Sequence, residues 1–286
     1  MNTKLQSFKE NAMRVVFAVC ACVSILAVIL ICFFLFANGI PTIGKIGVKE
    51  FLLGLDWKPL QNIFGILPMI IGSIYVTAGA VVIGVPIGLL CAVFLAKFCP
   101  DKLYKVFKPA VDLLAGIPSI VYGFFGLVVI VPVMQNLFGG SGKGVLTASI
   151  MLGIMILPTI ISVSEAAIRA VPDSYYEGAL ALGATHERST FLAVLPAAKS
   201  GITAGVILGL GRAIGEAMAV NMVAGNQAII PKNLLSGVRT LTSNIVLEMG
   251  YATDLHREAL IATALVLFVF ILIINLLFSL AKKEKK

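Results

Sequence analysis

Long apolar segments constrain this chain more than any other feature. A helix needs roughly 20 apolar residues to cross the hydrocarbon of a bilayer. The 286 residues are 59% hydrophobic and only 13% charged, with a mean hydropathy of +1.02, which excludes an ordinary soluble globular domain. We therefore predict an all-α, polytopic membrane protein with six transmembrane helices. The segments that are long enough lie at about 15–37, 66–96, 113–134, 145–168, 201–224 and 259–281.

The second apolar segment contains Pro86 and several glycines, so it could form one long tilted helix or two short ones. Charge favours one helix. With six spans, the N-terminal segment, the loops at 97–108 and 169–199 and the C-terminal tail share one side of the membrane. They carry twice as many Lys and Arg as the loops on the other side. Because positive residues favour the cytoplasm, we expect a multi-pass protein of the cell membrane with both termini inside.

The chain divides into two expected parts. Residues 1–65 hold the cytoplasmic N-terminal segment, the first span and the first external loop, and residues 66–286 hold the core with its cytoplasmic loop at 169–199. The apolar run near the N-terminus is too long for a signal peptide and is expected to remain as a span. The external loop at 225–258 is long, which suits either docking of a partner or a plain connector.

Arg212 and Glu216 stand out because they interrupt an otherwise apolar fifth segment. A charge at the middle of a membrane helix costs roughly 2.5 to 3.5 kcal/mol on insertion scales, so such groups face a partner or a wet pathway. On a continuous helix, they share one arc with small residues that let another helix approach closely. We expect this arc to face protein. Its members are Gly201, Gly205, Gly209, Arg212, Glu216 and Ala219.

Two roles remain open for the charged pair. The Arg212 guanidinium is always protonated and its fork of donors fits an oxyanion, which favours a place in an anion pathway. Alternatively, Glu216 at i+4 could close an intrahelical ion pair that only sets packing. In the pathway interpretation, the carboxylate of Glu216 competes with the anion and tunes its release.

Prolines interrupt the third and fourth segments. Pro118 and Pro158 free backbone carbonyls and bend helices, either as ordinary kinks or to aim polar groups at a cavity. Ser119 adds a hydroxyl donor beside Pro118 and is a candidate pathway residue. Glu165, near the end of the fourth segment, is expected in an interface or paired with Arg169 at i+4.

The loop at 169–199 is expected to hold two short helices with a hinge. Ser174 and Glu177 have the spacing of a capping box, and Gly183 is well placed as a left-handed helix end. The first helix is amphipathic and would expose Tyr176, Leu180 and Leu182 unless something covers them. Such a helix fits a groove in another protein.

Several other sites are excluded by sequence. The five cysteines lie in or beside apolar segments without a C-x-x-C pair, so we expect neither a metal site nor a cofactor. The run Gly139–Gly144 resembles a phosphate loop only superficially, because the spacing is wrong, and is expected to be an external turn. We find no catalytic constellation, and the net charge of +8 lies in loops and tails rather than in a nucleic-acid-binding pattern.

The loop also carries a family resemblance. Glu177-Gly178-Ala179, then Gly183 after three residues and Ala193-x-Leu195-Pro196 after nine more, resembles the E-A-A-x3-G-x9-I-x-L-P loop of ABC importer permeases. Gly178 and Ala193 depart from that pattern. The resemblance implies a type I ABC importer permease fold and a coupling loop that receives a cytoplasmic ATPase.

Two further stretches, Gly116–Gly123 and Gly211–Val220, resemble the phosphate-specific branch of these permeases, and its PstC-type more than its PstA-type subunit. This resemblance covers about residue 65 to the C-terminus. It implies a permease, not an enzyme, that forms half of a path for inorganic phosphate, with Arg212 and Glu216 lining it. The implied partners are a PstA-like permease, a cytoplasmic ATPase dimer and an extracytoplasmic phosphate-binding protein.

Two alternative functions remain at this point. A permease of the same class could carry another oxyanion, such as molybdate or sulfate, because an arginine fork does not identify its ligand. An ATP-independent secondary carrier is the rival from another class. Such carriers often have inverted repeats and further intramembrane titratable groups, whereas only one charged pair lies deep in a span here.

Overall fold

The structure, a computed structural model, describes residues 3–283 and the side chains of residues 10–277. It is helical apart from one short hairpin, in which β1 (Trp57–Lys58) pairs with β2 (Ile63–Phe64) around the turn η1 (Pro59–Gln61). The helices are α1 (Thr3–Ile46), α2 (Val48–Leu53), α3 (Leu67–Val93), α4 (Asp101–Gly116), α5 (Ser119–Phe125), α6 (Val131–Phe138), α7 (Val145–Arg169), α8 (Asp173–Ala181), α9 (His186–Ser189), α10 (Leu195–Gly215), α11 (Met218–Val223), α12 (Leu241–Glu248) and α13 (Asp254–Lys283).

Six helical segments of the described chain are long and apolar enough to cross a membrane, which confirms the predicted number of spans. Three of them contain π-helical turns: η2 (Phe94–Phe98) extends α3, whereas η3 (Gly126–Ile130) joins α5 to α6 and η4 (Thr190–Val194) joins α9 to α10. The second segment is a single helix despite Pro86, as the charge bias predicted. The spans are Glu10–Ile46, Leu67–Phe98, Ser119–Phe138, Val145–Arg169, His186–Gly215 and Asp254–Leu277.

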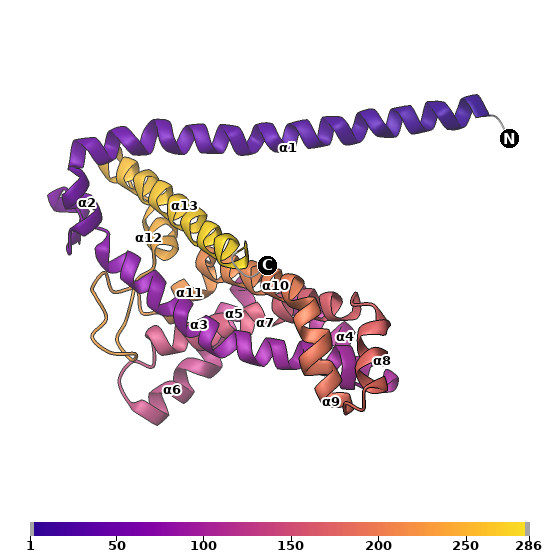
Figure 1. Cartoon of the computed structure of the whole chain (residues 1–286). Helices are drawn as coiled ribbons and strands as arrows, with labels where there is room; N and C mark the ends of the chain where they lie inside the picture. The colour runs from indigo at the N-terminus through magenta and orange to yellow at the C-terminus, as the bar shows by residue number, and fades with distance from the viewer. Residues whose placement is uncertain (1–2, 284–286) are drawn as a thin grey trace.

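Helix α7 forms the centre of the bundle, between α3 and α10 (Figure 1). Its buried face includes Met151, Leu152 and Ile156, which join the largest apolar cluster of the described residues. Glycines allow α3 to approach this face. A Cβ added to Gly84 would lie 2.8 Å from the carbonyl oxygen of Gly153 on α7. Because lipid tails are as apolar as leucine, close packing of small residues is what holds such helices together in a bilayer.

The first span lies apart from this bundle. Figure 1 shows α1 as a long helix that meets α13 at one end and extends away at the other. The contact involves Gly39, which is packed against Leu265, and Phe36, whose ring meets Phe268 edge-on at 6.3 Å. Side chains in the free part of α1 are exposed. Its apolar surface therefore faces lipid or another subunit.

The bundle has two distinct ends (Figure 1). We call the end that holds α4, α8 and α9 the α8 end. The opposite end, which holds α2, the hairpin and α12, is the α12 end.

The third span starts later than the sequence predicted. We expected it at 113–134, but α4 ends at Gly116 and a separate helix, α5, starts at Ser119. The reason is Pro118, which lacks an N–H and disfavours helical conformation in the preceding residue. Ile117 is accordingly extended, with φ −68° and ψ 127°. Residues 113–116 therefore belong to an exposed helix at the α8 end rather than to the span.

The fifth span also differs from the prediction of 201–224. It starts at His186, runs through α9, η4 and α10, and ends at Gly215. Glu216 is extended, with φ −73° and ψ 124°, and a new short helix, α11, begins at Met218. The break falls inside the stretch that the apolar pattern made continuous. The apolar periodicity of this stretch did not predict the break.

Candidate functional site

The glycine face of α10 is turned toward α7, as expected from its small residues. A Cβ added to Gly201, Gly205 or Gly209 would come within 2.4, 2.9 or 2.8 Å of a side-chain atom of α7. Arg212 continues this face, and its Nη1 donates to the Thr159 hydroxyl of α7 at 3.4 Å. The guanidinium thus lies between the two central helices of the bundle, beside a hydroxyl.

The intrahelical ion pair between Arg212 and Glu216 is not formed. Among the side chains that the structure describes, no carboxylate is within ion-pair distance of Arg212. The reason is the break after Gly215, which removes Glu216 from the helix that carries Arg212. The prediction of one helical arc is therefore wrong at Glu216 and Ala219, although the arc is correct from Gly201 to Arg212.

The side chain of Glu216 instead contacts the first turn of the next helix, α11. Its Oε1 accepts the backbone N–H of Ala219 at 3.0 Å, the role of a side chain that caps the first turn of a helix. Its backbone oxygen accepts the Thr242 hydroxyl at 2.9 Å. Both polar ends of this residue are thereby engaged by protein groups.

Ser119 lies at the other break, as the first residue of α5. Helix α5 packs on α11, because a Cβ on Gly123 would lie 2.8 Å from the Cα of Ala219. The Tyr122 hydroxyl donates to the carbonyl of Leu114 at 2.8 Å and so joins α5 to α4. No hydrogen bond joins Ser119 to Arg212 or Glu216 in the described chain. The two breaks are neighbours, but their polar groups are not in contact.

The loop at 169–199 has the predicted two helices, but only the first is separate, because α9 continues through η4 into α10. The capping box is wrong: α8 begins at Asp173, and no side chain caps it. Gly183 follows α8 with φ +84°, which confirms the left-handed end. Glu177 and Gly178 are exposed, and Ala179 is partly buried. Leu195 and Pro196 begin α10, within the rod of the fifth span.

Helix α8 packs against α9 and against η2, the turn that extends α3. The Tyr176 hydroxyl lies 2.6 Å from His186 Nδ1, and Phe98 meets the His186 ring at 4.5 Å. The ammonium of Lys97 lies 5.5 Å from the Tyr176 ring. Tyr176 is therefore partly covered by its own chain, whereas Leu182 is 91% exposed and presents an apolar side chain outward.

A buried carboxylate at the α8 end forms ion pairs with basic side chains of two helices, α4 and α7. Glu165 is 3% exposed and pairs with Arg169, as its spacing predicted. It also accepts the Tyr104 hydroxyl at 3.0 Å and lies 3.4 Å from the Lys108 ammonium. Burial, with the hydrogen bond to this carboxylate adding to it, raises the pKa of Tyr104. Tyr104 and Lys108 lie on α4, a helix that the sequence pattern does not predict, so neither is recognisable as a partner of Glu165 from sequence.

The sequence also missed α12. The segment was assigned to an external loop, but residues 241–244 of α12 are all buried. At the end of α12, the carboxylate of Glu248 accepts Trp57 Nε1 at 2.8 Å and Arg239 Nη1 at 2.7 Å, and lies 2.8 Å from His256 Nε2. Four parts of the chain meet there. A helix of eight residues, half of them polar, is too short to stand out as an apolar segment.

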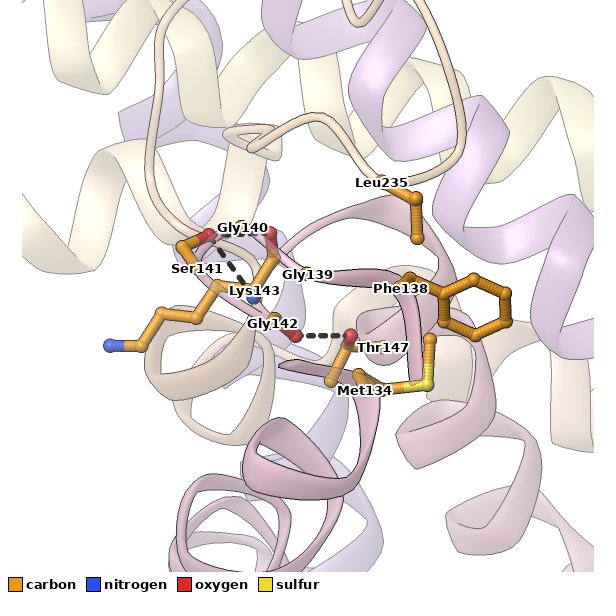
Figure 2. A pocket seen from close by; sticks show the side chains of 9 residues that line it. All are labelled: Met134, Phe138, Gly139, Gly140, Ser141, Gly142, Lys143, Thr147 and Leu235. Carbon is orange, nitrogen blue, oxygen red and sulfur yellow. Dashed lines mark hydrogen bonds between the residues drawn. The ribbon is translucent and has the colours of Figure 1, made fainter. Parts of the chain in front are cut away.

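The glycine loop after α6 forms a turn, as predicted. Gly139, Gly140 and Gly142 all have positive φ, between 67° and 72°. The loop lines a pocket of about 130 Å³ together with Met134, Phe138 and Leu235. Figure 2 shows that the side chain of Lys143 points away from Phe138. The Thr147 hydroxyl donates to the Gly142 carbonyl at 2.6 Å. With its ammonium directed outward, the loop does not form a phosphate cradle.

No described group of three or more His, Cys, Asp or Glu residues is placed to hold a metal ion. The polar groups available near the two breaks are instead a guanidinium, hydroxyls and a carboxylate. A guanidinium beside hydroxyls can bind an oxyanion, and a helix break inside a membrane protein is tolerated where protein or a water-filled cavity surrounds it.

Comparison with known proteins agrees with this architecture. The model of the binding-protein-dependent transport system inner membrane component family matches residues 84–284. The chain is 40% identical to the probable ABC transporter permease protein YqgH of Bacillus subtilis (strain 168), over 94% of this chain and 91% of the relative. It is 38% identical to the phosphate transport system permease protein PstC of Mesorhizobium japonicum, over 84% and 80%.

Among solved structures, a bacterial alginate ABC transporter, in complex with a periplasmic protein that holds an alginate pentasaccharide, shares the fold. The TM-score is 0.59 at 15% identity, with 95% of this chain and 96% of that chain covered. At that identity the likeness supports the fold alone. Together with the family match and the two relatives, it shows that this chain is a membrane component of an ABC importer and belongs to the binding-protein-dependent transport system inner membrane component family.

Proposed function

We propose that this chain is the PstC-like permease subunit of an ATP-driven phosphate importer and that Arg212 binds the anion in the translocation pathway. The single observation that carries the site is the Arg212 guanidinium, which lies between α10 and α7 with no carboxylate partner among the described side chains. The similarity to a curated phosphate permease supports the choice of phosphate.

The chain forms half of the pathway, and a PstA-like permease forms the other half. ATP is hydrolysed by a separate cytoplasmic ATPase dimer, which docks at the loop 169–199 through Glu177–Gly183 and the exposed Leu182. An extracytoplasmic phosphate-binding protein delivers the anion at the α12 end. The α8 end and both termini are then cytoplasmic, in line with the excess of Lys and Arg there.

The core of this function is residues 66–286, and residues 1–65 add the first span and the first external segment. Ser119 lines the pathway at the break before α5, and Glu216 lines it at the break after α10. Closure of the ATPase dimer would move α8, and the move would reach α3 through Tyr176, His186 and Phe98. Access to Arg212 then alternates between the two ends of the bundle.

The test is labelled-phosphate uptake by the assembled importer in vesicles, with the binding protein outside and ATP inside. At phosphate concentrations near wild-type half-saturation, Arg212→Gln should reduce uptake to between about a fifth and about a hundredth of the wild-type rate. Loss of a charge-assisted hydrogen bond costs about 1.5 to 3 kcal/mol, roughly 10-fold to 150-fold in affinity. Arg257→Gln, which removes an exposed arginine of α13, is the matched control and should leave uptake unchanged.

Three results would contradict the proposal. Loss of assembly in Arg212→Gln would assign the arginine a packing role instead, and uptake without internal ATP would favour a secondary carrier. Competition by sulfate or molybdate at lower concentration than unlabelled phosphate would reassign the cargo to another oxyanion.

A further inference from the structure

Helix α12 is buried in the bundle although it belongs to a segment between two spans. Leu241, Ser243 and Asn244 are 0% exposed, and Thr242 is 6% exposed. Hydroxyl and amide groups withdrawn from water need partners inside the protein. The partners of these groups indicate what the helix holds in place.

One partner is the break in the fifth span. The hydroxyl of Thr242 donates to the backbone oxygen of Glu216 at 2.9 Å. Carbonyls at the end of a helix have no intrahelical partner, and Glu216 is the C-cap residue that follows the last residue of α10. Thr242 therefore satisfies a carbonyl that would otherwise favour continued helix.

The start of α12 is itself fixed against α3. The backbone N–H of Leu241 donates to the Ser73 hydroxyl at 3.0 Å, and a Cβ on Gly72 would lie 2.5 Å from the carbonyl oxygen of Arg239. The other end is fixed by Glu248, which is 7% exposed and bonded to Trp57, Arg239 and His256. Helix α12 is thus held at both of its ends, so Thr242 within it cannot follow Glu216 if the break moves.

The sequence of residues 201–224 is also compatible with a conformation that differs from the observed one. Residues 201–224 read as one continuous helix, in which Glu216 lies four residues after Arg212 and can pair with it. In the observed conformation the break separates them, and Glu216 caps α11 through Ala219 instead. The same arginine is therefore open to an anion when the span is broken and occupied by a carboxylate when it is continuous.

We propose that Thr242 is a positioning residue that keeps the fifth span broken at Glu216 and so keeps the Arg212 guanidinium available to the transported anion. The inference rests on the proposed function of Arg212. It adds a residue, from a segment outside the six spans, that sets the anion affinity of the pathway without touching the anion.

The first experiment measures uptake kinetics in the same vesicle assay. Thr242→Val keeps the shape and removes the donor, so the apparent KM for phosphate should rise about tenfold, as when one charge-assisted hydrogen bond is diverted, while the maximal rate is retained. Thr242→Ser restores the hydroxyl and should stay within about twofold of wild type. The double variant Thr242→Val with Glu216→Gln removes the competing carboxylate and should recover most of the affinity.

The second experiment does not depend on the cargo. Spin labels at Leu208→Cys and Met218→Cys, both exposed positions, are introduced after replacement of the five native cysteines. In a continuous helix their Cα atoms are separated by about 15 Å along the axis. Thr242→Val should shift the distance distribution toward that of a continuous helix, and Thr242→Ser should not.

An unchanged distance in Thr242→Val, or a double variant no better than Thr242→Val, would overturn the inference. If wild-type vesicles take up no phosphate but the distance between the two spin labels still changes in Thr242→Val, the proposal that phosphate is the cargo fails. The proposal that Thr242 keeps the span broken at Glu216 is then still supported.

Discussion

Glu165→Gln is the substitution whose effect on stability follows most directly from the structure. The carboxylate is 3% exposed and engages Arg169 on its own helix with Lys108 and Tyr104 on α4. Glutamine keeps the volume and an oxygen that can accept the Tyr104 hydroxyl. It removes the negative charge that faces two cations.

The magnitude lies between two limits. Breaking a fully buried ion pair costs about 3 to 5 kcal/mol, and an exposed pair contributes about 0 to 1 kcal/mol. The side chains of Lys108 and Arg169 are 23% and 44% exposed, so water can partly replace the lost partner. We expect a loss of about 1.5 to 3 kcal/mol. On the entropy scale of soluble proteins, this lowers the melting temperature of a 286-residue chain by about 3 to 5 °C.

The assay is thermal unfolding of the purified protein in detergent, followed by tryptophan and tyrosine fluorescence. Glu258→Gln is the matched control, because Glu258 pairs with Lys45 at 2.8 Å but both side chains are largely exposed. The control should change the melting temperature little. Equal shifts for the two variants would refute the argument that burial decides the value of an ion pair here.

Three further variants test packing, backbone conformation and pH dependence by the same melting assay. Gly205→Leu should destabilise by about 1 to 3 kcal/mol, because a Cβ there would lie 2.9 Å from Ser164 Oγ, whereas Gly211→Leu meets open space and should not. Gly183→Ala forces a non-glycine residue into φ +84° and should cost about 1 to 2 kcal/mol despite the open space around it. The pKa of Tyr104 is raised by burial and the neighbouring carboxylate, so its neutral form stabilises the fold below about pH 10. That stabilisation is lost as pH rises through the raised pKa, and Tyr104→Phe should remove this loss.

The number of spans could be predicted from the sequence because hydropathy and helix length act locally, but the bounds of the third and fifth spans could not. The charge bias, counted over all the loops, correctly made residues 67–98 one helix. The direction of the glycine face of α10 and the pairing of Glu165 with Arg169 follow from the spacing of residues within a few turns of one another.

The missed features depend on contacts between distant residues. Helix α12 is short and only half apolar, and its buried polar groups have partners in Ser73, Glu216 and the side chains around Glu248. The break at Glu216 depends on a hydroxyl 26 positions later in the chain. Periodicity describes what one segment prefers alone, so it predicted a continuous fifth span.

Breaks in the spans indicate a pathway more directly than charges do. A break frees backbone carbonyls and N–H groups, which hydrocarbon cannot satisfy, so it persists only where protein or water is within reach. Two helices of the described chain are interrupted at neighbouring places, between α4 and α5 before Ser119 and between α10 and α11 after Gly215, and α5 packs on α11 through Gly123 and Ala219. A charge can be buried to fix packing, whereas two adjacent interruptions bring free backbone polar groups to the same region of the bundle. The position of Arg212 three residues before one of them is therefore a stronger argument for a transport role than its charge.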